Sequence, residues 1–197
     1  MTVSETLRAV NGFPEQPAAL RDATVILVDY QNTYTTGVME LDGWEAALES
    51  AADLLHRART AGSTVIHIIN DGGAGTPYDI RAEIGSIHPK VAPIDGEAVV
   101  VKQAPNAFVG TELGELVDAA GHSDVVIAGF MTHMCVTFTA EGAFLRGNAP
   151  TVVASASATR ALPTVLGDVA AEQLHRSALA TIGDLYGVIV PTPAELA

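Results

Sequence analysis

The sequence predicts an α/β fold: a single-domain, doubly wound, three-layer α/β/α sandwich around a mostly parallel six-stranded sheet. Short apolar runs rich in β-branched residues alternate with longer helical stretches, which is typical of strands joined by crossover helices. The chain has 197 residues, of which 48% are hydrophobic and 17% charged, so it can bury one sizeable core. It contains no repeat, low-complexity tract or linker, and we expect residues 1–197 to form one domain.

Six apolar runs have the length and composition of buried strands. The expected strands are 24–28, 63–69, 98–101, 124–128, 151–154 and 187–190. The first run is followed by Asp29, the third by Lys102, and the last by Pro191, which stops it. An acid or a lysine directly after a buried strand marks a candidate site edge in this architecture.

Four stretches are expected to be helical. The first, 42–62, begins with Asp42 and Glu45 at capping-box spacing and ends at Gly62, which suits the left-handed position after a helix. The other expected helices are 111–120, 136–145 and 168–185. Residues 1–21 are mixed in character and contain two prolines, so we expect an arm packed on the surface or on a partner subunit.

Charge and cysteine content exclude several classes of function. The chain has 10 Lys and Arg against 23 Asp and Glu, a formal charge of −13, which argues against nucleic acid or an anionic membrane as a partner. A single cysteine rules out an internal disulfide. The sequence contains no CxxC motif and no Cys/His cluster, so it lacks the usual pattern of a structural zinc site. A free thiol suits the reducing cytoplasm, where we expect the protein to reside.

Other sequence features bear on membranes, cofactors and assembly. No signal-peptide pattern begins the chain, and no uncharged apolar run reaches the roughly 18 residues of a membrane span. The glycine-rich segment 70–77 lacks the spacing of a phosphate-binding loop, so we expect a mobile loop and no cofactor. The mean hydropathy of +0.29 predicts apolar surface and therefore a homo-oligomer, a dimer or tetramer.

Three predicted strand ends place reactive side chains at one edge of the sheet. Asp29 follows the first strand, Lys102 the third, and Cys135, the only cysteine, follows the fourth at the expected start of a helix. The N–H groups of a helix N-terminus favour a thiolate. Cys135 would then be a nucleophile, Asp29 the group that takes its proton and returns it to the leaving group, and Lys102 the charge that tunes both. A buried structural cysteine, a turn-capping aspartate and a snorkelling lysine are the alternatives.

The ordered set of motifs resembles the isochorismatase-like cysteine hydrolases, which include nicotinamidases and N-carbamoylsarcosine amidases. The similarity extends from about residue 23 to residue 190. It rests on Asp29 with Gln31, on Lys102 with Asn106-Ala-Phe108, and on Gly129-x-x-Thr132-x-x-Cys135-Val136 with Thr139 and Ala140.

The resemblance implies that Asp29, Lys102 and Cys135 form the catalytic set of a hydrolase that cleaves an amide, carbamoyl or cyclic amide C–N bond through a thioester. It also implies a cis peptide bond between Phe130 and Met131. The backbone N–H groups of Met131 and Cys135 would form the oxyanion hole.

Two departures from family patterns narrow the activity. Residues 70–73 read Asn-Asp-Gly-Gly, without the aspartate and histidines with which nicotinamidases bind a metal, so we expect a metal-independent enzyme. Cys135 argues against the relatives that cleave a vinyl ether with the acid alone. An isochorismatase-type vinyl ether hydrolase that uses Asp29, and a catalytically idle binding or assembly module, remain the alternatives.

Several polar and aromatic residues near the expected strand ends could bind a small amide-type substrate. The candidates are Gln31, Tyr34, Asn106, Phe108, Thr132 and His133, with Tyr78 as a further pocket residue. We expect His133 to line the pocket and not to act as a papain-like base. Of the other histidines, His67 is expected to face the core or a neighbouring helix, and His56 and His175 to lie at the surface or an edge.

Overall fold

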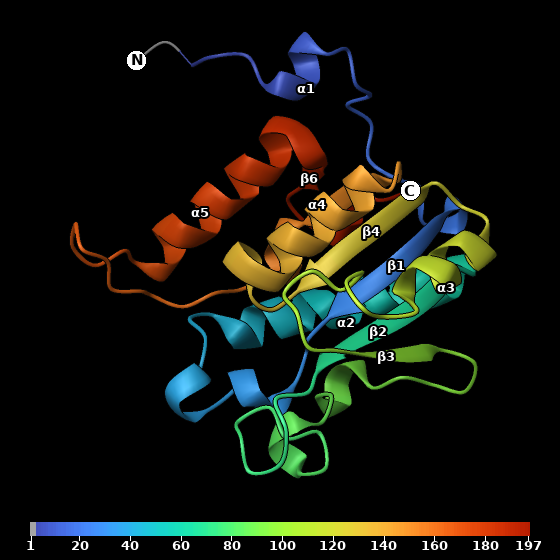
Figure 1. Cartoon of the computed structure of the whole chain (residues 1–197). Helices are drawn as coiled ribbons and strands as arrows, with labels where there is room; N and C mark the ends of the chain where they lie inside the picture. The colour runs from blue at the N-terminus through green and yellow to red at the C-terminus, as the bar shows by residue number, and fades with distance from the viewer. Residues whose placement is uncertain (1–2) are drawn as a thin grey trace.

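The computed structural model describes residues 3–197, which form one six-stranded sheet with the order β3-β2-β1-β4-β5-β6 (Figure 1). The strands are β1 Ala23–Val28, β2 Thr64–Asn70, β3 Ala98–Lys102, β4 Asp124–Gly129, β5 Ala149–Val153 and β6 Val188–Val190. Every strand pairs in parallel with its neighbours, so the sheet is parallel throughout and not only mostly so. The order reverses between β1 and β4, and ligands of open α/β sheets bind at such a switch point.

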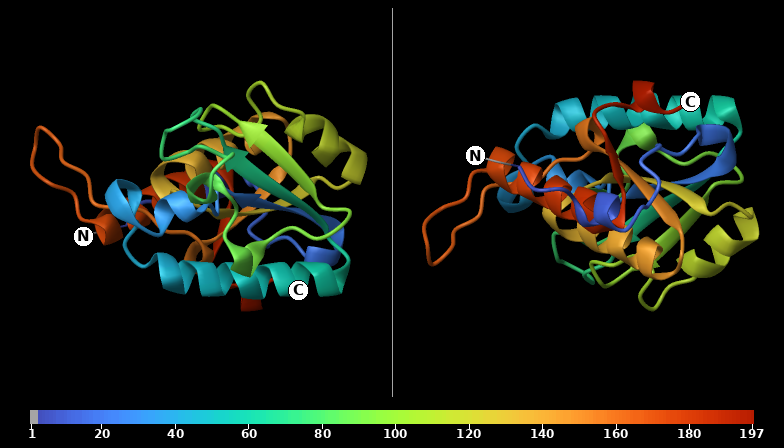
Figure 2. Two further views of the ribbon diagram at one scale, coloured as in Figure 1. Left: turned by 90° about the horizontal axis from the view of Figure 1, so that it is seen from below. Right: turned by 90° about the horizontal axis from the view of Figure 1, so that it is seen from above.

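Helices cover both faces of the sheet and give the three layers that the sequence predicts (Figure 2). The helices are α1 Leu7–Val10, α2 Trp44–Ala61, α3 Leu113–Ala120, α4 Thr137–Leu145 and α5 Ala171–Thr181. Side chains of β1 alternate between the layers: Val25 and Leu27 pack with α2, whereas Ile26 and Val28 pack with α3 and α4. Within residues 3–197, no helix combines the length and apolar character needed to cross a membrane.

The start of α2 differs from its prediction. Gly43, in a left-handed conformation with φ 73°, precedes the helix, and no side chain caps it. The Asp42 N–H donates to the Thr159 carbonyl at 3.0 Å, which commits Asp42 to a bridge with a distant segment. The predicted capping box is therefore wrong, although the helix does end at Gly62, where φ is 78°.

Two other helices begin later than predicted. The helix expected from residue 111 begins at Leu113, because the Thr111 hydroxyl accepts a hydrogen bond from the Leu113 N–H at 3.2 Å. The helix expected over 168–185 begins at Ala171, because Leu162 and Val169 close a hairpin with hydrogen bonds of 3.0 and 2.9 Å. This hairpin projects from the body of the molecule as the orange loop in Figure 2. After α5, residues Ile182–Tyr186 form a π-helical turn.

The amino-terminal arm packs on this π-helical turn. Of the residues expected to form the arm, the first two lie outside the described residues. The Leu7 N–H donates to Asp184 at 2.9 Å, and buried Arg8 donates to the Leu185 carbonyl at 3.3 Å. The arm therefore contacts the chain's own body.

The glycine-rich segment after β2 is held by specific contacts. Arg81 pairs with Asp71 at 2.9 Å and with Asp79 at 2.6 Å, and the Gly72 N–H donates to the Tyr78 carbonyl at 3.2 Å. These contacts fold the segment back on itself and place Tyr78 against Tyr34, with ring centroids 5.8 Å apart.

Candidate active site

Asp29 lies directly after β1 in an unusual backbone conformation. Its φ is 54°, and it is the single non-glycine residue with positive φ in the described part of the chain. The Asp29 N–H donates to the Ile68 carbonyl at 2.9 Å, and its own carbonyl accepts from the Gln31 N–H at 2.7 Å. A non-glycine residue in this region costs free energy, and such residues concentrate at functional sites.

Lys102, at the end of β3, connects Asp29 to Cys135. Its Nζ lies 2.8 Å from Asp29 Oδ2 and 3.3 Å from Cys135 Sγ. All three residues are buried: Asp29 is 0% exposed, Lys102 is 1% exposed and Cys135 is 7% exposed. The structure thus brings together the three strand-end residues singled out from the sequence, and we refer to them as the Asp29 cluster.

Burial and charge shift the protonation equilibria of the Asp29 cluster in a consistent direction. Burial raises the pKa of Asp29, and Lys102 only partly opposes the rise. No donor among the described residues gives either Asp29 oxygen a well-directed hydrogen bond, so the carboxylate is held mainly by charge. Burial lowers the pKa of Lys102, but Asp29 and Cys135 outweigh it, so its pKa lies above the usual value and it stays an ammonium.

The Cys135 thiol is protonated at rest. Burial and then the Asp29 charge raise the pKa of Cys135 to about 12, although Lys102 opposes them. Cys135 also lies inside the π-helical turn Thr132–Val136, before α4 begins, and not at the first position of an α-helix. The thiolate stabilisation expected from a helix N-terminus is therefore outweighed, and a neighbouring base is required to remove the proton.

The loop between β4 and Cys135 has a constrained backbone. The peptide bond between Phe130 and Met131 is cis, at the bond where the resemblance implies one. Gly129 has φ 156°, and a Cβ there would lie 2.1 Å from the Val28 carbonyl oxygen, so only glycine fits. Within residues 3–197 the Met131 N–H has no hydrogen-bond acceptor, while the adjacent Thr132 N–H donates to the Ala158 carbonyl at 2.9 Å.

Aromatic side chains surround the Asp29 cluster. Tyr34 is buried, and its ring lies 5.8 Å from the ring of Phe130 and 5.8 Å from that of half-buried Tyr78. Burial raises the pKa of Tyr34, with Asp29 adding to the effect, so its phenol stays neutral. Burial also raises the pKa of Tyr78, and the charges of Cys135 and Asp29 contribute, which places both tyrosines within electrostatic reach of the cluster.

Three predicted substrate-binding residues have structural partners instead. The amide of buried Gln31 donates to the Asn70 and Gly85 carbonyls at 3.0 and 2.7 Å and accepts from the Asn70 N–H at 2.8 Å. These bonds use both amide N–H groups of Gln31 and tie the residue to the loop after β2.

Asn106 and Phe108 also depart from their predicted role. Asn106 Oδ1 accepts from the Phe108 N–H at 2.9 Å, and its side chain packs so closely on Gly142 of α4 that a Cβ there would lie 2.5 Å from it. The Phe108 ring lies 5.4 Å from the Arg146 guanidinium carbon. Residues after a strand can turn toward either layer, and these two turn toward α4 and Arg146, the residue that follows it.

Thr132 and His133, the other predicted site residues, each pair with a residue from a distant segment. The Thr132 hydroxyl lies 2.8 Å from Nδ1 of His175 on α5, and His133 Nδ1 bonds the Thr159 hydroxyl. His175 is half-buried and joins this network, so the predicted edge residue has a specific partner. Ala171, Ala178 and Ile182 are buried at helical spacing around position 175, and this pattern was the signal that could have identified it.

Arg160 is a second residue that sequence reasoning missed. Its Nε is buried and has no hydrogen-bond partner, and none of the described acids pairs with it. Arg160 directly follows Thr159, the partner of His133. Burial lowers the pKa of His133 and the Arg160 charge lowers it further, while the same charge opposes the rise at Tyr78. The Arg160 guanidinium therefore lies near the side chains of both His133 and Tyr78.

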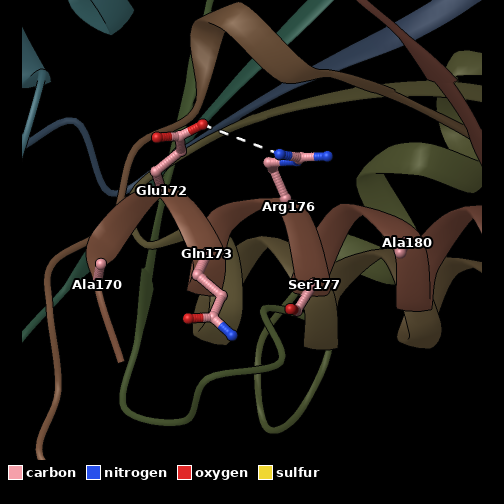
Figure 3. Close-up of a pocket in the computed structure, with 6 residues that line it drawn as sticks. All are labelled: Ala170, Glu172, Gln173, Arg176, Ser177 and Ala180. Carbon is pink, nitrogen blue, oxygen red and sulfur yellow. Dashed lines mark ion pairs between the residues drawn. The ribbon is translucent and has the colours of Figure 1, made fainter. Parts of the chain in front are cut away.

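The remaining surface offers a contrast to this site. A shallow hollow on the outer side of α5 contains only an exposed Glu172–Arg176 pair at 4.0 Å and small or neutral side chains (Figure 3). Among residues 3–197, no three His, Cys, Asp or Glu side chains come together as a metal site.

Comparison with known proteins gives consistent matches over nearly the whole chain. The isochorismatase domain family model matches residues 23–192. The chain is 31% identical over 186 residues to the secreted isochorismatase effector Isc1 of Verticillium dahliae, covering 94% of this chain and 96% of that protein. It is 33% identical to a streptothricin hydrolase of Streptomyces noursei, over 87% of this chain and 70% of that one. It is also 33% identical to the maleamate amidohydrolase of Pseudomonas putida, over 69% of each.

Solved structures agree with the sequence matches. An isochorismatase crystal structure from Pseudomonas putida KT2440 superposes with a TM-score of 0.95 at 35% identity and covers 99% of this chain and 100% of that one. The similarity therefore includes the amino-terminal arm, which the family model does not reach.

Proposed function

The chain belongs to the isochorismatase family, and from this premise we propose that it is a metal-independent cysteine hydrolase acting on the C–N bond of a small amide, carbamoyl or cyclic amide substrate. The observation that supports this most directly is the contact of Cys135 Sγ with Lys102 Nζ at 3.3 Å, with Asp29 on the same ammonium at 2.8 Å. A relative whose name states an amidohydrolase activity adds support.

In the first half of the reaction, Asp29 takes the thiol proton as Cys135 Sγ attacks the substrate carbonyl carbon. The new C–S bond converts the carbonyl oxygen into an oxyanion. When the oxyanion collapses, the C–N bond breaks and Asp29 returns its proton to the leaving nitrogen. The products of this half are a free amine or ammonia and a thioester on Cys135.

In the second half, water takes the place of the amine. Asp29 accepts a proton from the water as the water oxygen attacks the thioester carbon, and the C–S bond breaks. The sulfur recovers a proton from Asp29, and the acid product leaves. The same carboxyl group therefore acts as base and acid in turn, for which its raised pKa is suited.

Lys102 has a charge role in both halves. A thiol whose pKa is about 12 cannot ionise appreciably on its own near neutral pH. Because the ammonium of Lys102 contacts both anions, the negative charge can move from Asp29 to sulfur without losing its counterion. The pair Asp29 and Cys135 therefore shares one proton beside a fixed cation.

The oxyanion is stabilised by the backbone N–H groups of Met131 and Cys135. The Met131 N–H has no acceptor among residues 3–197, so it is free to donate to a substrate oxygen. Both groups belong to the backbone around the π-helical turn, so they are positioned before the substrate binds. Removal of one such donor from a comparable site costs about 10²- to 10³-fold in kcat.

The substrate carries an anionic group that Arg160 binds. Every other arginine in residues 3–197 contacts an acid or a backbone carbonyl through some guanidinium nitrogen, whereas Arg160 has no such contact and its Nε is buried. A guanidinium matches a carboxylate in geometry and charge. Maleamate, the compound in the name of one relative, is an amide that also has a carboxylate. Tyr34, Tyr78 and His133 complete the proposed substrate pocket.

An ammonia-release screen over anionic and neutral small amides tests these proposals. We expect turnover by the wild-type protein and none by Cys135→Ala, with His56→Ala, on the exposed side of α2, as the matched control. A thioester adduct in the intact mass of a rapidly quenched reaction would identify the intermediate. Turnover that survives Cys135→Ala but not Asp29→Asn would instead favour the vinyl ether hydrolase chemistry, and the absence of any substrate a binding module. An Arg160→Met variant that loses only the anionic substrates would support the anion site.

The proposed enzyme is a cytoplasmic homo-oligomer. Val165 and Leu166 at the tip of the hairpin that precedes α5 are 101% and 95% exposed, and the hairpin projects away from the sheet (Figure 2). Apolar residues in this position suit contact with another copy of the chain. Light scattering of the wild type against a Val165→Asp/Leu166→Asp variant tests the assembly, and cell fractionation tests the location.

A further inference from the structure

Among the described residues, one side-chain hydrogen bond joins the π-helical turn that contains Cys135 to α5. Thr132, which directly follows Met131, is fully buried, and its hydroxyl lies 2.8 Å from His175 Nδ1. The two residues are 43 positions apart in the sequence, so the contact is tertiary. α5 packs against this turn, and His175 is the residue through which the two elements form a hydrogen bond.

All other polar groups of Thr132 are already occupied. Its N–H donates to the Ala158 carbonyl at 2.9 Å, and its carbonyl accepts from the Thr137 hydroxyl at 2.7 Å. The backbone of Thr132 is therefore fixed by the segment before the hairpin and by the first residue of α4. The hydroxyl contact with His175 adds α5 as a third support.

His175 also lines a groove beside α2. The groove has a volume of about 630 Å³ and is also lined by Ala158 and Thr159 and by Ala46 and Ala47 of α2. None of the residues that line this groove belongs to the Asp29 cluster. His175 therefore contacts the turn from the α5 side, through the Thr132 hydroxyl.

We infer that His175 is a positioning residue, which holds Thr132 so that the adjacent Met131 N–H points at the substrate oxyanion. This inference rests on the proposed function, because it concerns the oxyanion donors of that same site. Displacement of a donor by a small distance weakens the transition state far more than substrate binding, since the oxyanion exists only after attack. Loss of the contact should thus lower kcat and leave KM nearly unchanged.

The test compares His175→Ala, His175→Asn and the control His56→Ala. We expect His175→Ala to lower kcat about 10- to 100-fold with KM within about 3-fold. Asparagine places an amide oxygen near the position of Nδ1, so His175→Asn should recover most of the activity. Thr132→Val should resemble His175→Ala, and the double variant should be no worse than either single one, because both remove the same contact.

A second measurement needs no substrate and keeps this inference separate from the proposed function. Hydrogen–deuterium exchange of peptides that span residues 129–136 should be faster in His175→Ala than in wild type, and unchanged in His56→Ala. The inference would be overturned by unchanged exchange, by a kcat within twofold of wild type, or by additive losses in the double variant. A rise of KM in proportion to the loss would also overturn it, since that would make His175 a substrate contact. Faster exchange in a protein without amidase activity would support the positioning role while refuting the proposed function.

Discussion

Two groups of charges lie against the same sheet and differ in how many hydrogen bonds their acids receive. In the Asp29 cluster, neither oxygen of the carboxylate receives a well-directed hydrogen bond, and burial raises its pKa. In the second group, the Glu97 cluster, the carboxylate of Glu97 receives four: two from Arg59 at 2.8 Å, one from His67 at 2.9 Å and one from the Ile94 N–H at 3.0 Å. Burial raises the pKa of Glu97, but these bonds outweigh it and hold the pKa at about 2.

The difference separates a reactive acid from a structural one. A saturated carboxylate with a low pKa cannot accept a proton near neutral pH, so Glu97 serves only to join α2 to the sheet. A buried carboxylate with a single cation beside it keeps free lone pairs and a raised pKa, which are the properties of a general base. Burial alone therefore does not mark an acid as a candidate general base, whereas burial without hydrogen-bond partners beside a thiol does.

The largest expected effect comes from replacing the acid of each cluster by the corresponding amide. Asp29→Asn should lower kcat by about 10³-fold, because the amide cannot take the thiol proton, while the fold is retained. Glu97→Gln should keep kcat within about twofold, because the Glu97 cluster has no contact with Cys135. Steady-state kinetics and thermal unfolding of both variants measure the two effects. Comparable losses of activity in the two variants would contradict the division of roles.

A feature of these two clusters could be predicted from the sequence only where the strand order alone determines it. Asp29, Lys102 and Cys135 could be found from the sequence because strand ends in a parallel sheet converge whatever the details of the loops. Gln31 obeys the same pattern, but the pattern does not reveal that its amide bonds the Asn70 and Gly85 backbone. The saturation of Glu97 likewise depends on α2, β2 and the turn before β3 meeting in space.

His175 and Arg160 show a second limit of sequence reasoning. The helix expected from residue 168 begins only at Ala171, so the inward face of α5 was not assigned before the hairpin at 162–169 was known. Arg160 is unusual only because it lacks an acceptor, and a missing partner can be recognised only once all its neighbours are placed.

The next expected effect concerns the rate at which Cys135 is alkylated. In Asp29→Asn this rate should rise, whereas kcat falls. The Asp29 charge is one cause of the raised thiol pKa, so Asp29→Asn should lower that pKa and increase the thiolate fraction near neutral pH. Iodoacetamide should therefore label Asp29→Asn about tenfold faster than wild type, although turnover falls. Intact-mass kinetics between pH 7 and 9 measure the rates, with Glu97→Gln as the control that should label at the wild-type rate. Slower labelling of Asp29→Asn would show that the carboxylate activates the resting thiol directly.

The smallest expected effect is on stability, and it belongs to the Glu97 cluster. Because the folded pKa of Glu97 is depressed to about 2, its contribution is fully present above its unfolded value near 4.5 and is lost as the pH falls from there through about 2. Solvent near Arg59, whose side chain is 30% exposed, screens the pair, so we expect the contribution to be about 1 kcal/mol. In urea unfolding at pH 7, the free energy of unfolding of Glu97→Gln should be lower than that of wild type by this amount. The difference should disappear as the pH approaches 2. The pH dependence should be reversed for Asp29. Because its folded pKa is raised, the ionised carboxylate lowers the stability of the folded protein, and this cost disappears on acidification. A gap between wild type and Glu97→Gln that stays constant from pH 7 to pH 2 would show that the hydrogen bonds of Glu97, and not its charge, hold α2 to the sheet.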